Sequence, residues 1–228
     1  MSTFKDFKDL YKDQDIYVVG SGPSLDFISP DFFDNKIVIG LNQIYKKIRV
    51  NYLVRKEAKL LETVLKETDK NIIHFISEYT DGVYSHGSNL EILVKNNYYD
   101  LRNNIIIYKH NNNNHKVPDN LPQDGLVASY STITTGIHLA AFMGAKNIIL
   151  VGHDCGSLDK KCNTKDYHTN ATYKIAWKNG REDYIKWLPK IERHTIKLKS
   201  MLKKDFGCNI YSLNPFINFG LEGHIYSK

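Results

Sequence analysis

Polar residues able to hold a phosphate follow a short apolar run near the start of the chain. Tyr17-Val18-Val19 is followed directly by Gly20-Ser21-Gly22-Pro23-Ser24. Glycines let backbone N–H groups approach a ligand closely, and serine hydroxyls supply further hydrogen bonds. A dinucleotide-binding loop would carry more glycines at Pro23 and Ser24, and no Gly-Lys-Ser/Thr follows as in a Walker loop. These residues alone fit either a phosphate-binding turn or a plain tight turn.

Three further polar groups stand at comparable places in the chain. Asn42-Gln43 follows the apolar run 36–41, and Gly152-His153-Asp154 follows the run 147–151. Thr134-Thr135-Gly136 stands at the expected start of a helix, where free N–H groups favour an anion. If the runs are parallel strands, ligands bind beyond their carboxyl ends, and we expect these groups to meet there. Asn42 as a turn residue and the threonines as helix caps are the structural alternatives.

Three side chains have the chemistry of a catalytic group. His168 lies in the polar segment 159–180, where an imidazole near its ordinary pKa can serve as general base toward an acceptor hydroxyl. A surface histidine fits His168 equally well. Asp154 can bind ribose, phosphate-bound Mg²⁺ or a hydroxyl, or be a solvated carboxylate, and His153 can be a hydrogen-bonded residue at a strand end. Cys155 and Cys162 lack the short spacing of a zinc site, so no metal site is predicted.

Apolar runs alternate with amphipathic segments along most of the chain, which is typical of βαβ units. This pattern predicts an α/β fold: a single Rossmann-like domain over residues 1–228, with a mostly parallel sheet and helices on both faces. The expected strands are 16–20, 36–42, 51–55, 72–76, 105–108, 147–151 and 209–212. The expected helices are 58–67, 90–95, 137–143 and 183–204, the third of them beginning with threonine caps and ending at Gly144.

Two segments lie outside this alternation. Phe4, Phe7, Leu10 and Tyr11 are spaced as on an amphipathic helix, which predicts an N-terminal helix within residues 1–14. Residues 155–180, after Gly152-His153-Asp154, are polar and predict an insert that can act as a lid.

Composition narrows the class of protein. The chain has 228 residues, three cysteines and a formal net charge of +6. Few cysteines indicate a reducing, cytoplasmic location, and no apolar run approaches the about 20 residues of a membrane span. The lysines are scattered, so nucleic acid is not an expected partner. The positive net charge is the one feature that favours the alternative of a nucleic-acid-associated module. The sequence is also compatible with a homo-oligomer.

The order of these motifs resembles a known superfamily. The residues that carry the resemblance are Gly20-Ser21-Gly22-Pro23-Ser24-Leu25, Asn42-Gln43, Thr134-Thr135-Gly136 and the segment Gly144 to Asp154. The superfamily joins bacterial sialyltransferases that use CMP-sialic acid, motility-associated flagellin glycosylation factors and 6-hydroxymethylpterin pyrophosphokinase-like proteins. The resemblance extends from the first strand to Asp154.

The resemblance to the sialyltransferases implies two roles. The first loop and the Asn-Gln pair would hold the cytidine nucleotide, and a histidine in the late insert would be the catalytic base. His168 is the matching base in this chain. Matched residue by residue, the resemblance implicates Ser21, Gly22, Ser24, Asn42, Thr135, Gly136, Gly152 and Asp154. The predicted nucleotide-binding set also includes their neighbours Gly20, Pro23, Gln43 and Thr134. Ser21 replaces an asparagine of those enzymes, and Gly156 and Asn163 stand where phosphate-binding tyrosines are expected.

The leading hypothesis is therefore a glycosyltransferase that moves a sialic-acid-like sugar from a CMP donor to a hydroxyl acceptor and requires no metal cofactor. A pyrophosphokinase that uses ATP and Mg²⁺ on a pterin alcohol is the second hypothesis, and it needs more carboxylates than the obvious Asp154. A non-catalytic nucleotide-binding module is the third.

Overall fold

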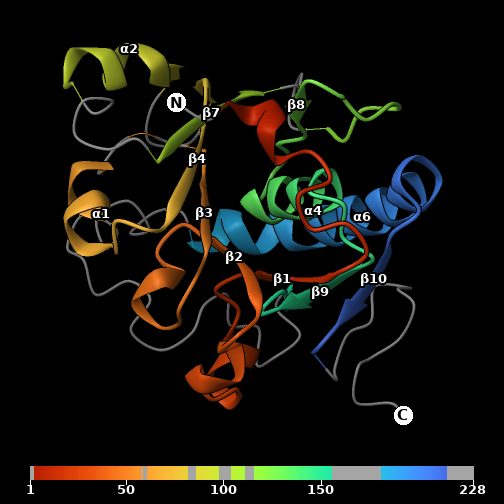
Figure 1. Cartoon of the computed structure of the whole chain (residues 1–228). Helices are drawn as coiled ribbons and strands as arrows, with labels where there is room; N and C mark the ends of the chain where they lie inside the picture. The colour runs from red at the N-terminus through yellow and green to blue at the C-terminus, as the bar shows by residue number, and fades with distance from the viewer. Residues whose placement is uncertain are drawn as a thin grey trace.

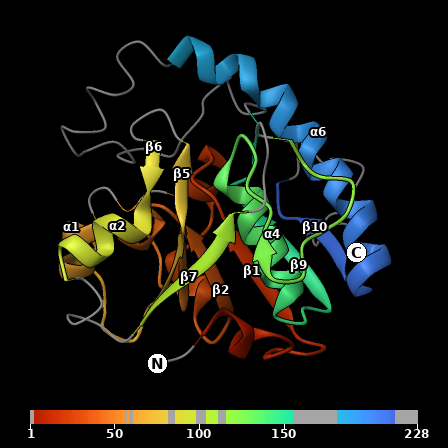
Figure 2. The same ribbon diagram turned by 90° about the horizontal axis from the view of Figure 1, so that it is seen from above.

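The computed structural model describes residues 3–56, 58, 61–81, 86–97, 104–110, 116–155 and 181–214. One parallel sheet of eight strands runs through the domain (Figures 1 and 2). In sheet order its strands are β10 (Asn209–Ser212), β9 (Asn147–Val151), β1 (Asp15–Val19), β2 (Ile37–Leu41), β3 (Tyr52–Arg55), β4 (Ile73–Ser77), β7 (Ile105–His110) and β8 (Gly125–Leu126). The fold is the α/β, Rossmann-like architecture predicted from the alternation of apolar runs.

The strand order reverses beside β1. The chain moves from β1 outward through β2, β3 and β4, and later returns to place β9 on the other side of β1. In the register, Val18 lies between Ile39 of β2 and Leu150 of β9. Ligands of open α/β sheets bind beyond the carboxyl ends of the strands at such a reversal. The loops that follow β1 and β9 therefore flank the expected position of a ligand.

Helices cover both faces of the sheet, as predicted. α4 (Thr132–Phe142) and α6 (Arg181–Phe206) lie on one face, and α1 (Leu61–Glu67) and α2 (Asn89–Lys95) lie on the other (Figure 2). Tyr52 and Val54 belong to the apolar cluster that contains α4. Because side chains alternate along a strand, Arg55 points toward the opposite face. No helix in the described part of the chain is long and apolar enough to cross a membrane.

The N-terminal segment is not the predicted helix. Only η1 (Phe4–Phe7) forms a 3-10 turn, and the residues after it form turns with positive φ at Asp9 and Asp13. The N–H groups of Asp9 and Tyr11 donate to the carbonyls of Phe142 and Met143, over 3.0 and 2.7 Å. These bonds satisfy carbonyls at the end of α4 that have no partner inside the helix. The segment therefore caps α4, while Phe4 and Phe7 add to the core.

Other local differences have local causes. The crossover after β1 consists of the 3-10 turns η2 (Pro23–Phe27) and η3 (Pro30–Phe33), each begun by a proline. Residues between the expected strand 72–76 and the expected helix 90–95 contain the antiparallel hairpin β5 (Tyr79–Asp81) and β6 (His86–Ser88). Helix α4 is capped by the hydroxyl of Ser131 rather than by a threonine. Its predicted end at Gly144 is confirmed, with φ +89° at that glycine.

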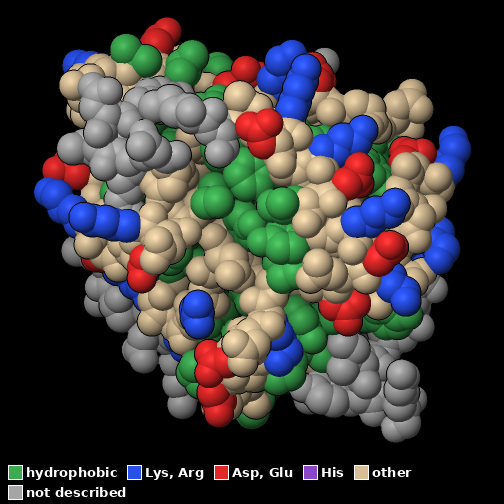
Figure 3. Space-filling view, in the orientation of Figure 1, with side chains coloured by type: hydrophobic (Ala, Val, Ile, Leu, Met, Phe, Trp, Pro, Cys, Tyr) green, Lys and Arg blue, Asp and Glu red, His purple; other side chains and the backbone are tan. Residues whose placement is uncertain are grey.

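Charge is distributed without a track of one sign on the face in Figure 3. Lys and Arg side chains are interspersed there with Asp and Glu side chains around the margin, while hydrophobic side chains gather at the centre (Figure 3). A nucleic-acid groove requires basic side chains gathered along one path. The described residues on this face form no such path.

Candidate functional site

The loops that follow β1 and β9 are joined by backbone hydrogen bonds. The N–H of Gly20 donates to the carbonyl of Val151 over 2.8 Å, and the N–H of Gly22 donates to the carbonyl of Gly152 over 2.7 Å. A Cβ on Gly22 would lie 2.5 Å from the Gly152 oxygen, and Gly152 has φ +62°. The glycines therefore allow two loops of the protein to approach each other. The N–H groups of Gly20 and Gly22, predicted to face a phosphate, donate within the protein.

Asp154 is the anchor of this junction. Its Oδ2 accepts from the N–H of Ser24 over 2.6 Å, and its Oδ1 accepts from the Ser24 hydroxyl over 2.5 Å and from Nδ2 of Asn214 over 2.7 Å. Only 3% of Asp154 is exposed. Burial raises the pKa of its carboxyl, while the hydrogen bonds from Ser24 and Asn214 oppose that rise. Asp154 thus links the chain after β1, β9 and β10.

His153 is also buried beside the junction. Its Nε2 lies 2.7 Å from the Oγ1 of Thr195 in α6, and the Thr195 hydroxyl donates to the carbonyl of Ile191. Burial lowers the pKa of His153 to about 4, so the ring is neutral at pH 7. These contacts give His153 a packing role between β9 and α6. His168, the other predicted histidine, lies outside the described residues, as does most of the predicted insert 155–180.

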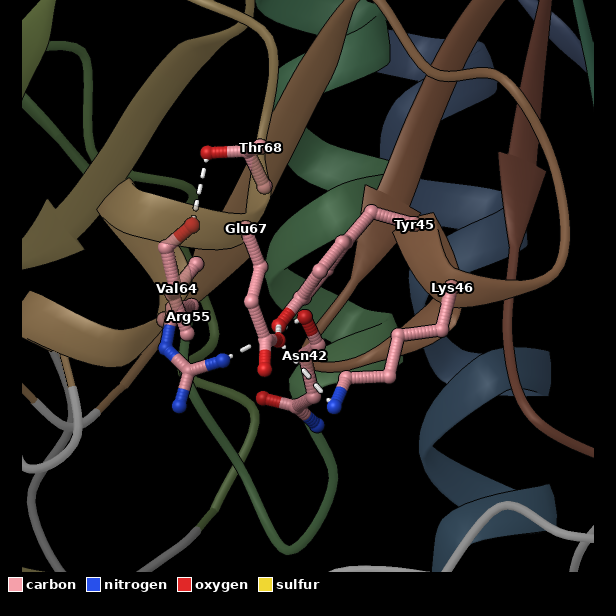
Figure 4. Close-up of polar contacts among 7 residues, drawn as sticks. All are labelled: Asn42, Tyr45, Lys46, Arg55, Val64, Glu67 and Thr68. Atoms are coloured by element: carbon pink, nitrogen blue, oxygen red, sulfur yellow. Dashed lines mark hydrogen bonds and ion pairs between the residues drawn. The ribbon is translucent and has the colours of Figure 1, made fainter.

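Asn42 and Arg55 meet at the ends of β2 and β3 (Figure 4). Asn42 has φ +55°, its N–H donates to the carbonyl of Val54 over 3.1 Å, and its own carbonyl accepts from Nη1 of Arg55 at 3.3 Å. The side-chain amide of Asn42 makes no hydrogen bond within the part of the chain that the structure describes. Asn42 is therefore a corner residue whose side chain stays available to a ligand.

Arg55 is a buried cation without a carboxylate partner among the described residues. It is 3% exposed, and its Nε is buried with no hydrogen-bond partner. The Glu67 carboxylate drawn in the same view accepts from the hydroxyl of Tyr45 over 2.5 Å and pairs with Lys46 at 3.0 Å (Figure 4). The Arg55 carbonyl accepts from the Tyr108 hydroxyl over 3.2 Å. The main chain at the end of β3 is thereby held from β7.

Asn89 holds the chain that follows Arg55. Its Nδ2 donates to the carbonyls of Lys56 and Ser77, over 2.5 and 2.8 Å, and its Oδ1 accepts from the N–H of Ala58. The side chain is fully buried at the start of α2. All three bonds are between Asn89 and the main chain, so this one residue positions the loop after β3 against the end of β4.

The start of α4 lies next to the end of β3. Nζ of Lys56 donates to the carbonyl of Ser129 at 3.4 Å, just before the Ser131 cap. Thr134 is occupied structurally, because its Oγ1 bonds the Ser131 carbonyl over 2.8 Å and accepts from the N–H of Ser129. Thr135 is different: its Oγ1 is buried without a partner in the described part of the chain.

Gly136 brings α4 onto the sheet. A Cβ at this position would lie 2.9 Å from side-chain atoms of Leu41 and Val18. The helix can therefore lie directly over β1 and β2, with its first turn, where the macrodipole is positive, at their carboxyl ends. This first turn is an anion-attracting backbone feature near the predicted residues.

An aromatic group flanks that first turn. The ring of Tyr130 stacks on His194 with centroids 5.4 Å apart and lies 5.7 Å from Trp187, both in α6. Nζ of Lys190 lies 5.0 Å from the same ring. The start of α4 is thus fixed from α6 as well as from Lys56.

The remaining predicted residues are described by their place in the fold and their burial. Pro23 is the first residue of η2, Gln43 is buried, and Ser21 is half-buried beside the junction. Within the described residues, no group of three His, Cys, Asp or Glu side chains is arranged to hold a metal ion. The described donor set is therefore rich in amides, hydroxyls and cations.

The sequence reasoning missed four residues of this edge. Arg55, Asn89, Thr195 and Asn214 act through contacts with distant parts of the chain. Arg55 and Asn214 each stand at or just after a strand end, and that position is the one signal available from sequence. No family model, curated protein or solved structure matches this chain.

Proposed function

We propose that the chain is a glycosyltransferase that moves a sialic-acid-like sugar from a CMP donor to a hydroxyl acceptor. One observation carries the proposal. Asn42, the start of α4 and the joined loops after β1 and β9 all follow or cover the carboxyl ends of adjacent strands, where the strand order reverses. Nucleotides bind at this position in open α/β sheets.

Different parts of the site bind different parts of the donor. The joined loops are a fixed floor, because Gly22 and Ser24 are bonded to Gly152 and Asp154. The free side-chain amide of Asn42 can both donate to and accept from the nucleotide. The first turn of α4 attracts the single phosphate of CMP through its dipole and its hydroxyls.

The reaction needs one proton transfer. A base removes the proton of the acceptor hydroxyl as its oxygen bonds to the anomeric carbon, and the bond from that carbon to the phosphate oxygen breaks. CMP leaves with the electron pair, stabilised by N–H and hydroxyl donors. We propose His168 as the base, on the resemblance given above.

Pyrophosphoryl transfer is the second candidate, and the donor set makes it the weaker one. That reaction uses Mg²⁺ held by carboxylates against the phosphates. Both oxygens of Asp154 already accept hydrogen bonds from Ser24 and Asn214. A metal would have to displace those donors.

A thermal-shift series tests the choice between the candidates. CMP or CDP at about one hundred times its Kd stabilises the native state by about 2.7 kcal/mol, which raises the melting temperature by about 5–10 °C for a chain of this size. We expect this rise without added metal and a smaller one with ATP or GTP. Stabilisation by ATP with Mg²⁺ alone would contradict glycosyl transfer and support the pyrophosphokinase.

A further inference from the structure

Arg55 carries a charge that the described protein does not balance. Arg55 is 3% exposed, its Nε has no partner, and no described carboxylate pairs with it. A buried charge is tolerated when it is paired and hydrogen-bonded. The carbonyl of Asn42, at 3.3 Å from Nη1, is a neutral acceptor and provides a weak partner.

The unused part of the guanidinium has a definite shape. Nη1 is directed to Asn42, which leaves the edge formed by Nε and Nη2. Two parallel N–H donors on one edge match the two oxygens of a carboxylate or two oxygens of a phosphate. The free amide of Asn42 is beside this residue and adds a further donor (Figure 4).

The surrounding bonds hold the main chain at Arg55 in place. The Tyr108 hydroxyl bonds its carbonyl, and Asn89 bonds the carbonyl of Lys56 next to it. A binding group gains affinity when it is ordered before the ligand arrives, because less conformational entropy is lost. The arrangement thus fixes a cation at the end of β3, beside the proposed nucleotide edge.

We infer that Arg55 and Asn42 form an oxyanion subsite, and that its occupant is the carboxylate of the donor sugar. The inference rests on the proposed function for the identity of the donor. The phosphate of the nucleotide has the same chemistry and is the alternative source of the oxyanion. In both cases the subsite makes the protein selective for a ligand with a negative group at this position.

The test uses Arg55→Met, with Arg49→Met as the matched control at an exposed arginine. Equilibrium binding is measured for CMP, CMP-sialic acid and the methyl ester of CMP-sialic acid. We expect the wild type and Arg49→Met to bind the free acid at least about tenfold more tightly than the ester, and Arg55→Met to bind both alike. CMP affinity should be unchanged in Arg55→Met. An equal loss for all three ligands would assign the subsite to the phosphate instead and overturn the carboxylate.

A second measurement separates this inference from the proposed function. Inorganic phosphate is a probe that needs no nucleotide, and it should raise the melting temperature of the wild type more than that of Arg55→Met. Without ligand, Arg55→Met should melt at or above the wild-type temperature, because replacing an unpaired buried charge by an apolar side chain removes its desolvation cost. If no cytidine ligand binds while the phosphate difference persists, the proposed function fails and the oxyanion subsite stands. If Arg55→Met melts lower and responds to phosphate as the wild type does, the subsite is refuted and Arg55 is structural.

Discussion

The N–H of Gly22 donates to the carbonyl of Gly152 across 2.7 Å, and this bond makes one unit of two loops that are 130 residues apart in the chain. Asp154 strengthens the unit through its bonds to Ser24. The loops flank the reversal in strand order, so the floor of the proposed nucleotide site is set before a ligand binds. A ligand that binds at this edge therefore does not have to order the main chain of these two loops.

Gly22→Ala tests this junction. The new Cβ would lie 2.5 Å from both the Gly152 oxygen and Oδ2 of Asp154, so the loops must separate, and we expect a loss of about 2–4 kcal/mol in the free energy of unfolding. Gly207→Ala is the control, because Gly207 has φ +70° with nothing within 4 Å of a Cβ. It should lose only the about 1 kcal/mol of backbone strain. Equal losses in urea unfolding would refute the close contact.

Asp154→Asn tests the role of the carboxylate. Every bond that Asp154 makes to Ser24 or Asn214 is one it accepts, so an amide nitrogen on either oxygen position would face a donor. We expect a loss of about 1–3 kcal/mol, measured by chemical unfolding. Asp34→Asn, at an exposed carboxylate, should change little. A wild-type midpoint for Asp154→Asn would show that these hydrogen bonds contribute nothing.

Seven of the eight strands of the sheet were predictable, because most of them are nearly continuous apolar runs, as strands buried on both faces must be. The strand β8 was not predicted, because it is only two residues long. The N-terminal segment was not, because the spacing of Phe4 and Phe7 fits a helix equally well. Its conformation is decided by the end of α4, which bonds the N–H groups of Asp9 and Tyr11. Hydrogen bonding to the carbonyls at the end of α4 therefore determines the conformation here, and the helical spacing of the apolar residues does not.

The site was predictable only in part, for the same reason. The sequence of Gly20 to Ser24 predicts a backbone that can approach a ligand closely, whereas the N–H groups of Gly20 and Gly22 donate to carbonyls at the end of β9 and in the loop after it. What approaches is the loop after β9, and a local pattern cannot name a partner 130 residues away. Arg55 was not predicted as a site residue, because a charged residue at a strand end is usually solvated. Its burial depends on packing that no local sequence signal encodes.

Stability should fall in mild acid. Burial lowers the pKa of His153 to about 4, against about 6.5 in the unfolded chain. Between these values the unfolded chain binds a proton that the folded chain excludes. The contribution of His153 is therefore present above pH 6.5 and is lost as the pH falls to 4, by up to about 3 kcal/mol.

Urea unfolding at neutral pH and near pH 4.5 measures this effect. His153→Gln does not titrate, so its stability should decline less than that of the wild type. Some decline should remain, since burial also lowers the pKa of His138, to about 3. If the free energy of unfolding falls by the same amount between the two pH values in both proteins, His153 is excluded as a source of the pH dependence.

His168→Ala tests the proposed base. Its removal should lower kcat by about 10²–10⁴-fold, the usual contribution of a general base, and leave the affinity for CMP nearly unchanged. His224→Ala serves as the comparison at a second histidine that the proposal does not use. Unchanged turnover in His168→Ala would remove that residue from the mechanism.

The most direct test of glycosyl transfer follows the donor itself. Purified protein is incubated with CMP-sialic acid and a hydroxyl acceptor, without added metal, and free CMP is measured over time. We predict formation of CMP with transfer of the sugar, and loss of this activity in His168→Ala. No CMP from this donor, together with AMP from ATP and Mg²⁺ in the presence of a pterin alcohol, would contradict the account.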